Sequence, residues 1–162
     1  MTVTTYCRRR SSAGFTMVEL LVTIAIATIL TTIAVPSFSG LIANQRAKTA
    51  ASELFGSLLK ARSEAIMRNA NVTVSPLAGG WDHGGWQILG PGAVVLESHG
   101  AVPGVVITTT GGAAVTYRPS GRVTTTSTAS LLVTTTSGST TNNQCISLNL
   151  SGRPSQQQAP AC

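Results

Sequence analysis

Charged and aromatic side chains are scarce in this chain. Of its 162 residues only 10% are charged and 4% are aromatic, with five acidic residues and two histidines. His83 and His99 stand alone, no two carboxylates are close in sequence, and no flanking motif points to a set of Ser, His and Asp. These shortages argue against a catalytic site, so we expect no enzyme and no cofactor.

Apolar residues, by contrast, are plentiful and concentrate near the N-terminus. Residues 15–35 are apolar or small except for Glu19 and a few threonines, whose hydroxyls can bond back to helical carbonyls. About 20 residues at ~1.5 Å rise span a bilayer core of roughly 30 Å, which predicts a transmembrane helix. Arg8, Arg9 and Arg10 precede this run and no comparable cluster follows it. The positive-inside rule then places the N-terminus in the cytoplasm and the remainder in the periplasm, as in an inner-membrane protein.

The segment before the apolar run has the composition of a leader that is removed. An ordinary secretory signal carries small residues after a shorter apolar region, whereas here Ser11, Ser12, Ala13 and Gly14 come before it. Cleavage there would remove residues 1–14 and leave the apolar run on the mature protein as an anchor. Half of the formal net charge of +6 would leave with the three leader arginines, so that charge is a weak argument for an anionic partner.

Glu19 is the one charged residue inside the apolar run. A carboxylate near the bilayer centre costs about 2.5–3.5 kcal/mol on insertion scales, and such residues are functional candidates by default. Alternatively, Glu19 lies only about 6 Å along the helix from Phe15, near the headgroups, where water lowers that cost. The residue alone leaves both interpretations open, and the surrounding pattern favours the functional one.

That pattern is GFTMVELLVTIAIATIL after a basic leader, with the acid as the fifth residue from Phe15. It resembles the class III signal and N-terminal helix of type IV pilins and pseudopilins. The resemblance implies cleavage between Gly14 and Phe15 by a prepilin peptidase, N-methylation of the Phe15 amine, and a subunit-assembly role for Glu19 opposite that amine in a neighbouring pilin. Pro36 falls where pilins commonly carry a proline, and a helix kink is expected there because proline lacks a backbone donor.

Residues 36–70 predict an amphipathic continuation of the same helix, about 55 residues long in all, that packs under a sheet. Glu64 lies four residues from both Lys60 and Arg68, which is the spacing of ion pairs on a solvent face. A stop near residues 69–71 is expected. Apolar positions recur every three, four or six residues to form one stripe: Leu41, Ala47, Ala51, Leu54, Leu58, Ala61 and Ala65.

The remainder, residues 71–162, predicts a periplasmic β domain. Short runs that alternate Val, Ile or Leu with Thr or Ser are separated by Gly, Pro, Asn and Ser clusters, which favours an antiparallel sandwich or meander over a parallel α/β sheet. The fold class is therefore α+β, with the long N-terminal helix on an antiparallel sandwich. The expected strands are 72–75, 86–89, 93–97, 105–109, 114–117, 121–126, 130–136 and 145–150.

A narrower resemblance covers nearly the whole chain. The strings LLKARSEAIMRNANVTVSP, WDHGGWQIL, YRPSGRVT and CISLNLSGRP are similar to the FimT/FimU and GspH minor-pilin family. The resemblance implies a minor type IV pilin in the initiation or tip complex of pilus assembly, with roles in twitching motility and adhesion and with major and minor pilins as partners. A type II secretion pseudopilin with the same anchor and a related sandwich is the nearest alternative.

Three cysteines would leave one unpaired in an exported protein. Cys7 leaves with the leader, so Cys145 and Cys162 are expected to pair in the oxidising periplasm, with a pair of free thiols as the less favoured alternative. The loop of about 17 residues would contribute on the order of 3 kcal/mol by the chain-entropy estimate. Neither cysteine has metal-ligand spacing, so no metal site is expected.

DNA is a weaker candidate partner. Some members of the FimT-like group bind DNA through a C-terminal Gly-Arg-x-Arg element, and Gly152 and Arg153 match its start, but Ser155 replaces the second arginine. Arg118, Arg122 and Arg153 form at most a modest basic surface for phosphates. Without an aromatic platform for bases, a solvated polar face is the better interpretation of these arginines.

Overall fold

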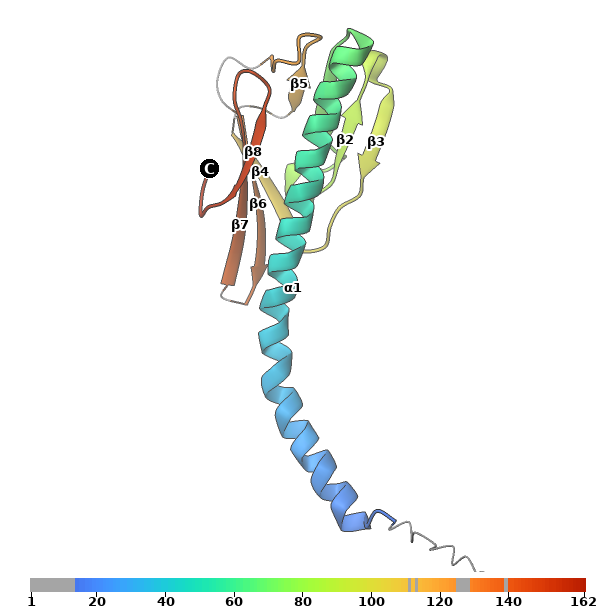
Figure 1. Cartoon of the computed structure of the whole chain (residues 1–162), viewed down its shortest axis with the longest axis vertical. Coiled ribbons are helices and arrows are strands. Elements are labelled where there is room, and N and C mark those ends of the chain that lie inside the picture. Colours follow the sequence, from blue (N-terminus) through green and yellow to red (C-terminus); the bar gives the residue numbers. More distant parts are fainter. Residues whose placement is uncertain (1–13, 111, 113, 125–128, 139) are drawn as a thin grey trace, which may run out of the picture. The chain divides into compact units, whose positions relative to one another are not determined.

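The computed structural model of the protein describes residues 14–110, 112, 114–124, 129–138 and 140–162. Within these residues one long helix is followed by eight strands and two short 3₁₀ helices (Figure 1). The chain divides into two compact units, Met1–Ser37 and Phe38–Cys162.

Helix α1, Met17–Arg68, has 52 residues and confirms the predicted long helix. It ends where expected: Asn69 adopts a left-handed φ of 48°, and the Ala70 N–H donates to the Ala65 carbonyl at 3.2 Å. A short polar side chain tolerates this conformation better than most, which explains why an asparagine follows the last helical residue.

One face of α1 inside the second unit is buried. Leu54 and Leu58 are fully covered, together with Ala47, Ala51, Ala61 and Ala65, as the stripe predicted. The inclusion of Leu41 was wrong, because its side chain is 62% exposed. The buried face begins at Ala43, and at about 100° per residue a position two earlier points to the opposite side of the helix.

The strands form two four-stranded antiparallel sheets, which confirms the predicted sandwich-like α+β class. The first sheet has the order β3-β2-β1-β5 and the second β4-β6-β7-β8. Their bounds are β1 Val72–Pro76, β2 Trp86–Leu89, β3 Val95–His99, β4 Val105–Thr110, β5 Val115–Tyr117, β6 Ala129–Ser137, β7 Thr140–Leu148 and β8 Pro154–Gln158, with the 3₁₀ helices η1 Trp81–His83 and η2 Pro91–Ala93.

A single hydrophobic core joins α1 to both sheets. Leu54 and Leu58 pack in one cluster with Trp86 and Ile88 of the first sheet and Leu131 of the second. Two side-chain hydrogen bonds also tie the helix to the sheets: the Trp86 indole donates to Ser57 Oγ at 2.9 Å, and Thr135 Oγ1 donates to the Ala43 carbonyl at 3.0 Å. Every buried apolar residue of the described chain lies at or beyond Ala43, so the second unit has the means to fold by itself.

Several strand boundaries differ from the predictions. The run at 93–97 begins as strand only at Val95, because the preceding η2 contains Gly92 at φ 70° and Ala93 at φ 59°. The described part of the predicted strand at 121–126 is a turn with a single bridge between Tyr117 and Val123; residues 125 and 126 lie outside the described residues. The first half of β7 and all of β8 were not predicted, since their Thr, Asn and Gln residues give no apolar alternation.

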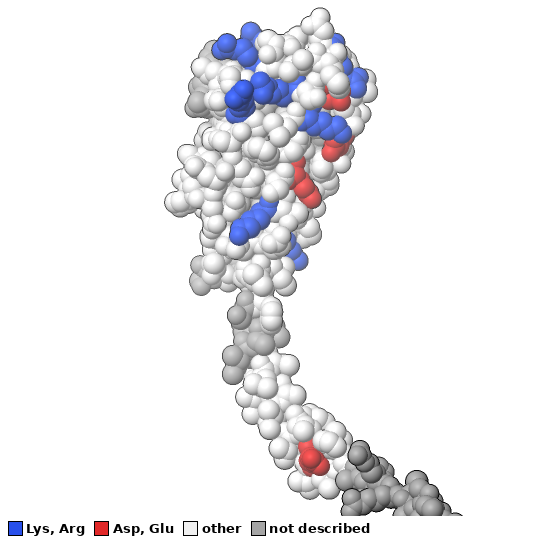
Figure 2. Space-filling model, viewed as in Figure 1, with Lys and Arg blue, Asp and Glu red and all other residues white. Residues whose placement is uncertain are grey.

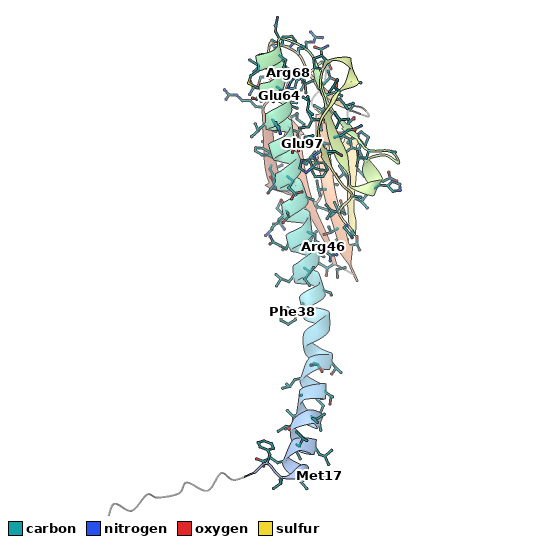
Figure 3. All side chains as sticks on the ribbon, turned by 90° about the vertical axis from the view of Figure 1, so that its right-hand side faces the viewer. Met17, Phe38, Arg46, Glu64, Arg68 and Glu97 are labelled. Carbon is teal, nitrogen blue, oxygen red and sulfur yellow. A yellow bond between two sulfur atoms is a disulfide. The ribbon has the colours of Figure 1, made fainter. Side chains whose placement is uncertain are left out.

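The expected ion pairs on α1 are confirmed in one case and wrong in the other. Arg68 Nε lies 2.5 Å from Glu64 Oε2, one turn apart at the end of the helix (Figure 3). Lys60 pairs instead with Glu97 of β3. The tertiary structure offers Lys60 a carboxylate on another element, which the helical spacing rule cannot anticipate.

Candidate assembly segment and basic turns

Gly14 and Phe15, the residues at the expected cleavage site, precede the first turn of α1. Phe15 is 69% exposed, and a Cβ placed on Gly14 would meet no atom within 4 Å. A peptidase would therefore find no steric obstacle from the described part of this unit. Cleavage between the two residues and N-methylation of Phe15 stay predictions.

Glu19 occupies the first turn of α1, where its backbone N–H donates to Thr16 Oγ1 at 3.2 Å. Thr16 is thus the N-cap and Glu19 the third helical residue, so the sequence Thr-x-x-Glu has the spacing of a capping box. A carboxylate in the first turn is also favoured by the helix dipole. This local role was missed by sequence reasoning, although the Thr-x-x-Glu spacing in TMVE carries the signal.

The surface around Glu19 is apolar on every side of the helix. Phe15, Met17, Val18, Leu20, Leu21, Val22, Ile24, Ile26, Ile29 and Leu30 are all more than half exposed. The threonine hydroxyls turn inward as expected: Thr23 donates to the Leu20 carbonyl and Thr28 to the Ala25 carbonyl, both at 2.8 Å. A helix that is apolar all round needs a cover outside its own unit.

No helix has a sufficiently long and apolar stretch to cross a membrane within the residues that the structure describes. The transmembrane assignment of residues 15–35, the leader 1–14 and the domain bounds 36–70 and 71–162 stay predictions.

Pro36 lies inside α1, and the backbone is assigned as helix at that position. The expected kink at Pro36 stays a prediction.

Cys145 and Cys162 form a disulfide, with their Cα atoms 5.4 Å apart, which confirms the expected pair. Cys145 is in β7 and is 1% exposed. The bridge ties the segment after β8 to the face of the second sheet. Cys7, expected to leave with the leader, lies outside the described residues.

Two tight turns come together at the end of α1. In one, the Gly121 N–H donates to the Arg118 carbonyl at 2.8 Å; in the other, the Gly152 N–H donates to the Asn149 carbonyl at 2.9 Å. A Cβ on Gly152 would lie 2.1 Å from the Gly121 carbonyl oxygen, so only glycine permits this approach. Arg62 of α1 donates from Nε to that same oxygen at 3.0 Å and fixes the turn to the helix.

The interlocked turns bring the predicted arginines to one region. Arg118, Arg122 and Arg153 are all exposed, and Figure 2 shows basic side chains gathered across the upper end of the second unit. The sequence predicted these three arginines as a group. It did not predict that Arg62 joins them through its hydrogen bond to the Gly121 carbonyl. The spacing along the chain gave no sign that Gly121 and Gly152 would meet.

Comparison with known families defines the class of protein. Residues 50–152 match the family described as type II transport protein GspH, so the chain belongs to that family. Residues 9–35 match the prokaryotic N-terminal methylation motif. The predicted FimT/FimU and GspH-type resemblance is thereby confirmed. The chain is a pilin-like structural protein, whose family implies assembly with other pilins and processing by prepilin peptidase.

Solved structures give the same fold. Two crystal forms of the type IV minor pilin FimU from Pseudomonas aeruginosa strain PAO1 match with TM-scores of 0.57 and 0.54 and identities of 21% and 22%. The first alignment covers 68% of this chain and 91% of FimU, and the second covers 70% and 87%. The comparison with curated proteins found no match.

Proposed function

We propose that the chain is a minor type IV pilin that takes part in the initiation or tip complex of pilus assembly. The precursor sits in the inner membrane with its N-terminus in the cytoplasm and its β domain in the periplasm. Prepilin peptidase cuts between Gly14 and Phe15, and the processed chain joins a filament through the N-terminal half of α1. Its partners are other major and minor pilins.

Glu19 on its apolar surface is the observation that supports this proposal most directly. It is the only charged residue in 14–32, and the neighbouring large side chains are exposed for contact. In a low-dielectric setting a carboxylate is stabilised by an opposite charge within a few ångströms. The Phe15 amine of a neighbouring subunit, which remains cationic after methylation, supplies such a charge.

The experiment must separate this assembly role from helix capping. Glu19→Gln removes the charge but keeps a residue suited to a capping box, whereas Glu19→Ala removes both. We expect both variants to be cleaved and both to be lost from purified pili, measured by immunoblotting of membranes and sheared filaments. Glu53→Gln, which removes an exposed carboxylate farther along α1, should be incorporated normally. Normal incorporation of Glu19→Gln would refute the charge-pairing role.

The type II secretion pseudopilin is the second candidate, and the family match at residues 50–152 supports it. Deletion of the gene separates the machines. Loss of piliation and twitching with normal enzyme secretion supports the pilus, whereas loss of secretion with intact pili supports the pseudopilus.

DNA binding is a third candidate, because the meeting of the Gly121 and Gly152 turns groups Arg118, Arg122 and Arg153. The purified second unit should then shift duplex DNA in a salt-dependent way, less strongly after Arg153→Ala. Ser155→Arg restores the missing second arginine on an exposed position and should strengthen the shift. If neither variant changes a measured shift, these residues carry no DNA site.

A further inference from the structure

The free edge of β8 differs from the other three sheet edges in the described structure. β3 carries a register irregularity and the charged Glu97. β5 is only three residues long and bridges to the segment after it through Tyr117. β4 is met at its start by the chain after η1, since a Cβ on Gly84 would lie 2.7 Å from the Val105 carbonyl oxygen. Such devices normally prevent strands from pairing with other chains.

β8 has none of these devices along its outer side. It pairs with β7 in continuous register, and within the described chain no strand or bridge is assigned to its other side. Residues 155–158 are Ser-Gln-Gln-Gln, uncharged and all exposed. The only proline is the first residue of the strand, where it leaves the rest of the edge intact.

Hydrogen-bond alternation shows which backbone groups face outward. The Asn149 N–H donates to the Arg153 carbonyl at 3.3 Å, so these residues form a hydrogen-bonded pair at the start of the β7–β8 ladder. Pairs alternate along an antiparallel ladder, which makes Pro154, Gln156 and Gln158 the non-bonded positions. Pro154 has no N–H to donate, which agrees with its place at a non-bonded position of the ladder. The N–H and C=O groups of Gln156 and Gln158 therefore point away from β7.

The C-terminal segment leaves this edge uncovered. Asn143 Nδ2 donates to the Pro160 carbonyl at 2.8 Å, and the Cys162 sulfur bonds to Cys145 of β7 and lies 3.6 Å from the Leu131 carbonyl oxygen of β6. The segment after β8 thus turns back across the face of the sheet over β7 toward β6. The disulfide holds the nearest covering segment away from the outer side of β8.

We propose that β8 is a docking edge for a second copy of this chain, with the two β8 strands antiparallel and centred on Gln157. In that register Gln156 of each copy lies opposite Gln158 of the other, and each pair exchanges its outward backbone bonds. The pairing is isologous, so it closes as a dimer. It adds an interaction that the proposed pilin function does not require.

Charge and side-chain chemistry favour a second copy as the occupant. Residues 154–162 contain no charged side chain, and the two glutamine rows would face each other in an amide ladder. Arg153 is four residues from the centre, so the two Arg153 side chains start about 26 Å apart at ~3.3 Å per residue and do not repel appreciably. The contact is small, so association should be weak and concentration-dependent.

The test uses residues 38–162, which contain the whole described core, and therefore does not depend on Glu19 or on assembly. Sedimentation velocity should show a monomer–dimer equilibrium for the wild type. Gln156→Pro removes an outward N–H without removing a bond to β7, and should be monomeric at the same concentrations. Gln156→Ala keeps the backbone donor and is the matched control, so it should dimerise within about threefold of the wild type. Thermal unfolding and the intact disulfide verify that each variant is folded.

Residue-resolved amide exchange provides a second measurement on the unmodified domain. The Gln156 and Gln158 amides should become protected as concentration rises, whereas the Gln157 amide, which faces β7, should not change. A wild-type domain that stays monomeric to about 1 mM overturns the proposal and leaves the edge to a strand from a different protein. Equal dimerisation of the folded proline variant, or concentration-independent exchange, overturns it as well.

Discussion

The two halves of α1 differ in how their apolar side chains are covered. In residues 17–32 large apolar side chains are exposed on every side, and Glu19 is the only charge. In residues 43–65 alanines and leucines fill one buried face, while charged residues lie on the other. The amphipathic half finds its cover in the sheets of its own chain. The large apolar side chains of the other half are exposed in the described structure, which supports the assembly role proposed for it.

Polar groups follow the same division. The N-terminal threonines bond to carbonyls of their own helix, as Thr32 does to Ile29 at 2.7 Å. In the other half Ser57 accepts from Trp86, which lies in a different element. Because the polar side chains of the first half are hydrogen-bonded within their own helix, they need no particular tertiary partner. The buried polar side chain of the second half depends on a partner in the sheet.

The largest expected effect tests the buried face. Leu58→Ala should lower the free energy of unfolding of residues 38–162 by about 2–5 kcal/mol, because it leaves a cavity in a fully packed core. The matched control is Leu59→Ala, the next residue, which is 43% exposed and should cost less than about 1 kcal/mol. Urea unfolding measures both. Similar losses at the two positions would break the distinction between the faces.

An intermediate effect is expected at the buried polar contact. Ser57→Ala leaves the buried Trp86 indole N–H without its partner, so stability should fall by about 1–3 kcal/mol. Ser63→Ala, on an exposed position of the same helix, should change stability by less than about 0.5 kcal/mol. Unfolding followed by near-ultraviolet circular dichroism of the tryptophans reports both values. An unchanged Ser57→Ala variant would mean that the indole contact adds nothing.

The smallest effect concerns the ion pair between Lys60 of α1 and Glu97 of β3. The hydrogen bond from Lys60 lowers the pKa of Glu97, and a second one with His99 Nε2 at 2.6 Å lowers it further, while Glu97 in turn raises the pKa of Lys60. The Glu97 contribution is present above its ordinary pKa of 4.5 and is lost as pH falls through the lowered folded value. The Lys60 contribution is present below 10.5 and is lost as pH rises through the raised folded value.

Lys60→Gln should therefore be slightly less stable than the wild type between about pH 5 and pH 10, and the difference should shrink at lower pH. Thermal unfolding across this range measures it. Lys48→Gln, another exposed position on α1, serves as the control. A stability difference that persists unchanged at pH 2 would assign the effect of Lys60 to something other than its charge.

Periodicity predicted the elements whose apolar residues repeat regularly. The long helix and β1, β2 and β4 were found within a residue or two of their bounds, because alternation and helical spacing reflect burial on one face. β8 was missed, since a run of glutamines has no such pattern and pairs only because β7 lies beside it. Leu41 was assigned to the wrong face, because exact helical phase is set by where the sheets begin to cover α1.

The candidate site shows the same limit. The roles of Glu19, Phe15 and Gly14 were predicted from a contiguous motif, and Cys145 and Cys162 were paired by counting. Arg62 was not connected with the basic turns, and Lys60 was given the wrong partner. Both residues contact groups far away in sequence, the Gly121 carbonyl and the Glu97 carboxylate.

The sequence by itself determined the apolar N-terminal helix with its single acid, the amphipathic continuation, the β-rich remainder and the class of protein. These features depend on the spacing of residues along the chain, because that spacing fixes which side chains share a face of a helix or strand and where the element ends. Only the tertiary structure decided that Gly121 meets Gly152, that Lys60 reaches Glu97, and that β8 presents a bare edge. Those contacts depend on how elements that are distant in the chain pack in one core and pair in the sheets. No local sequence pattern determines that arrangement.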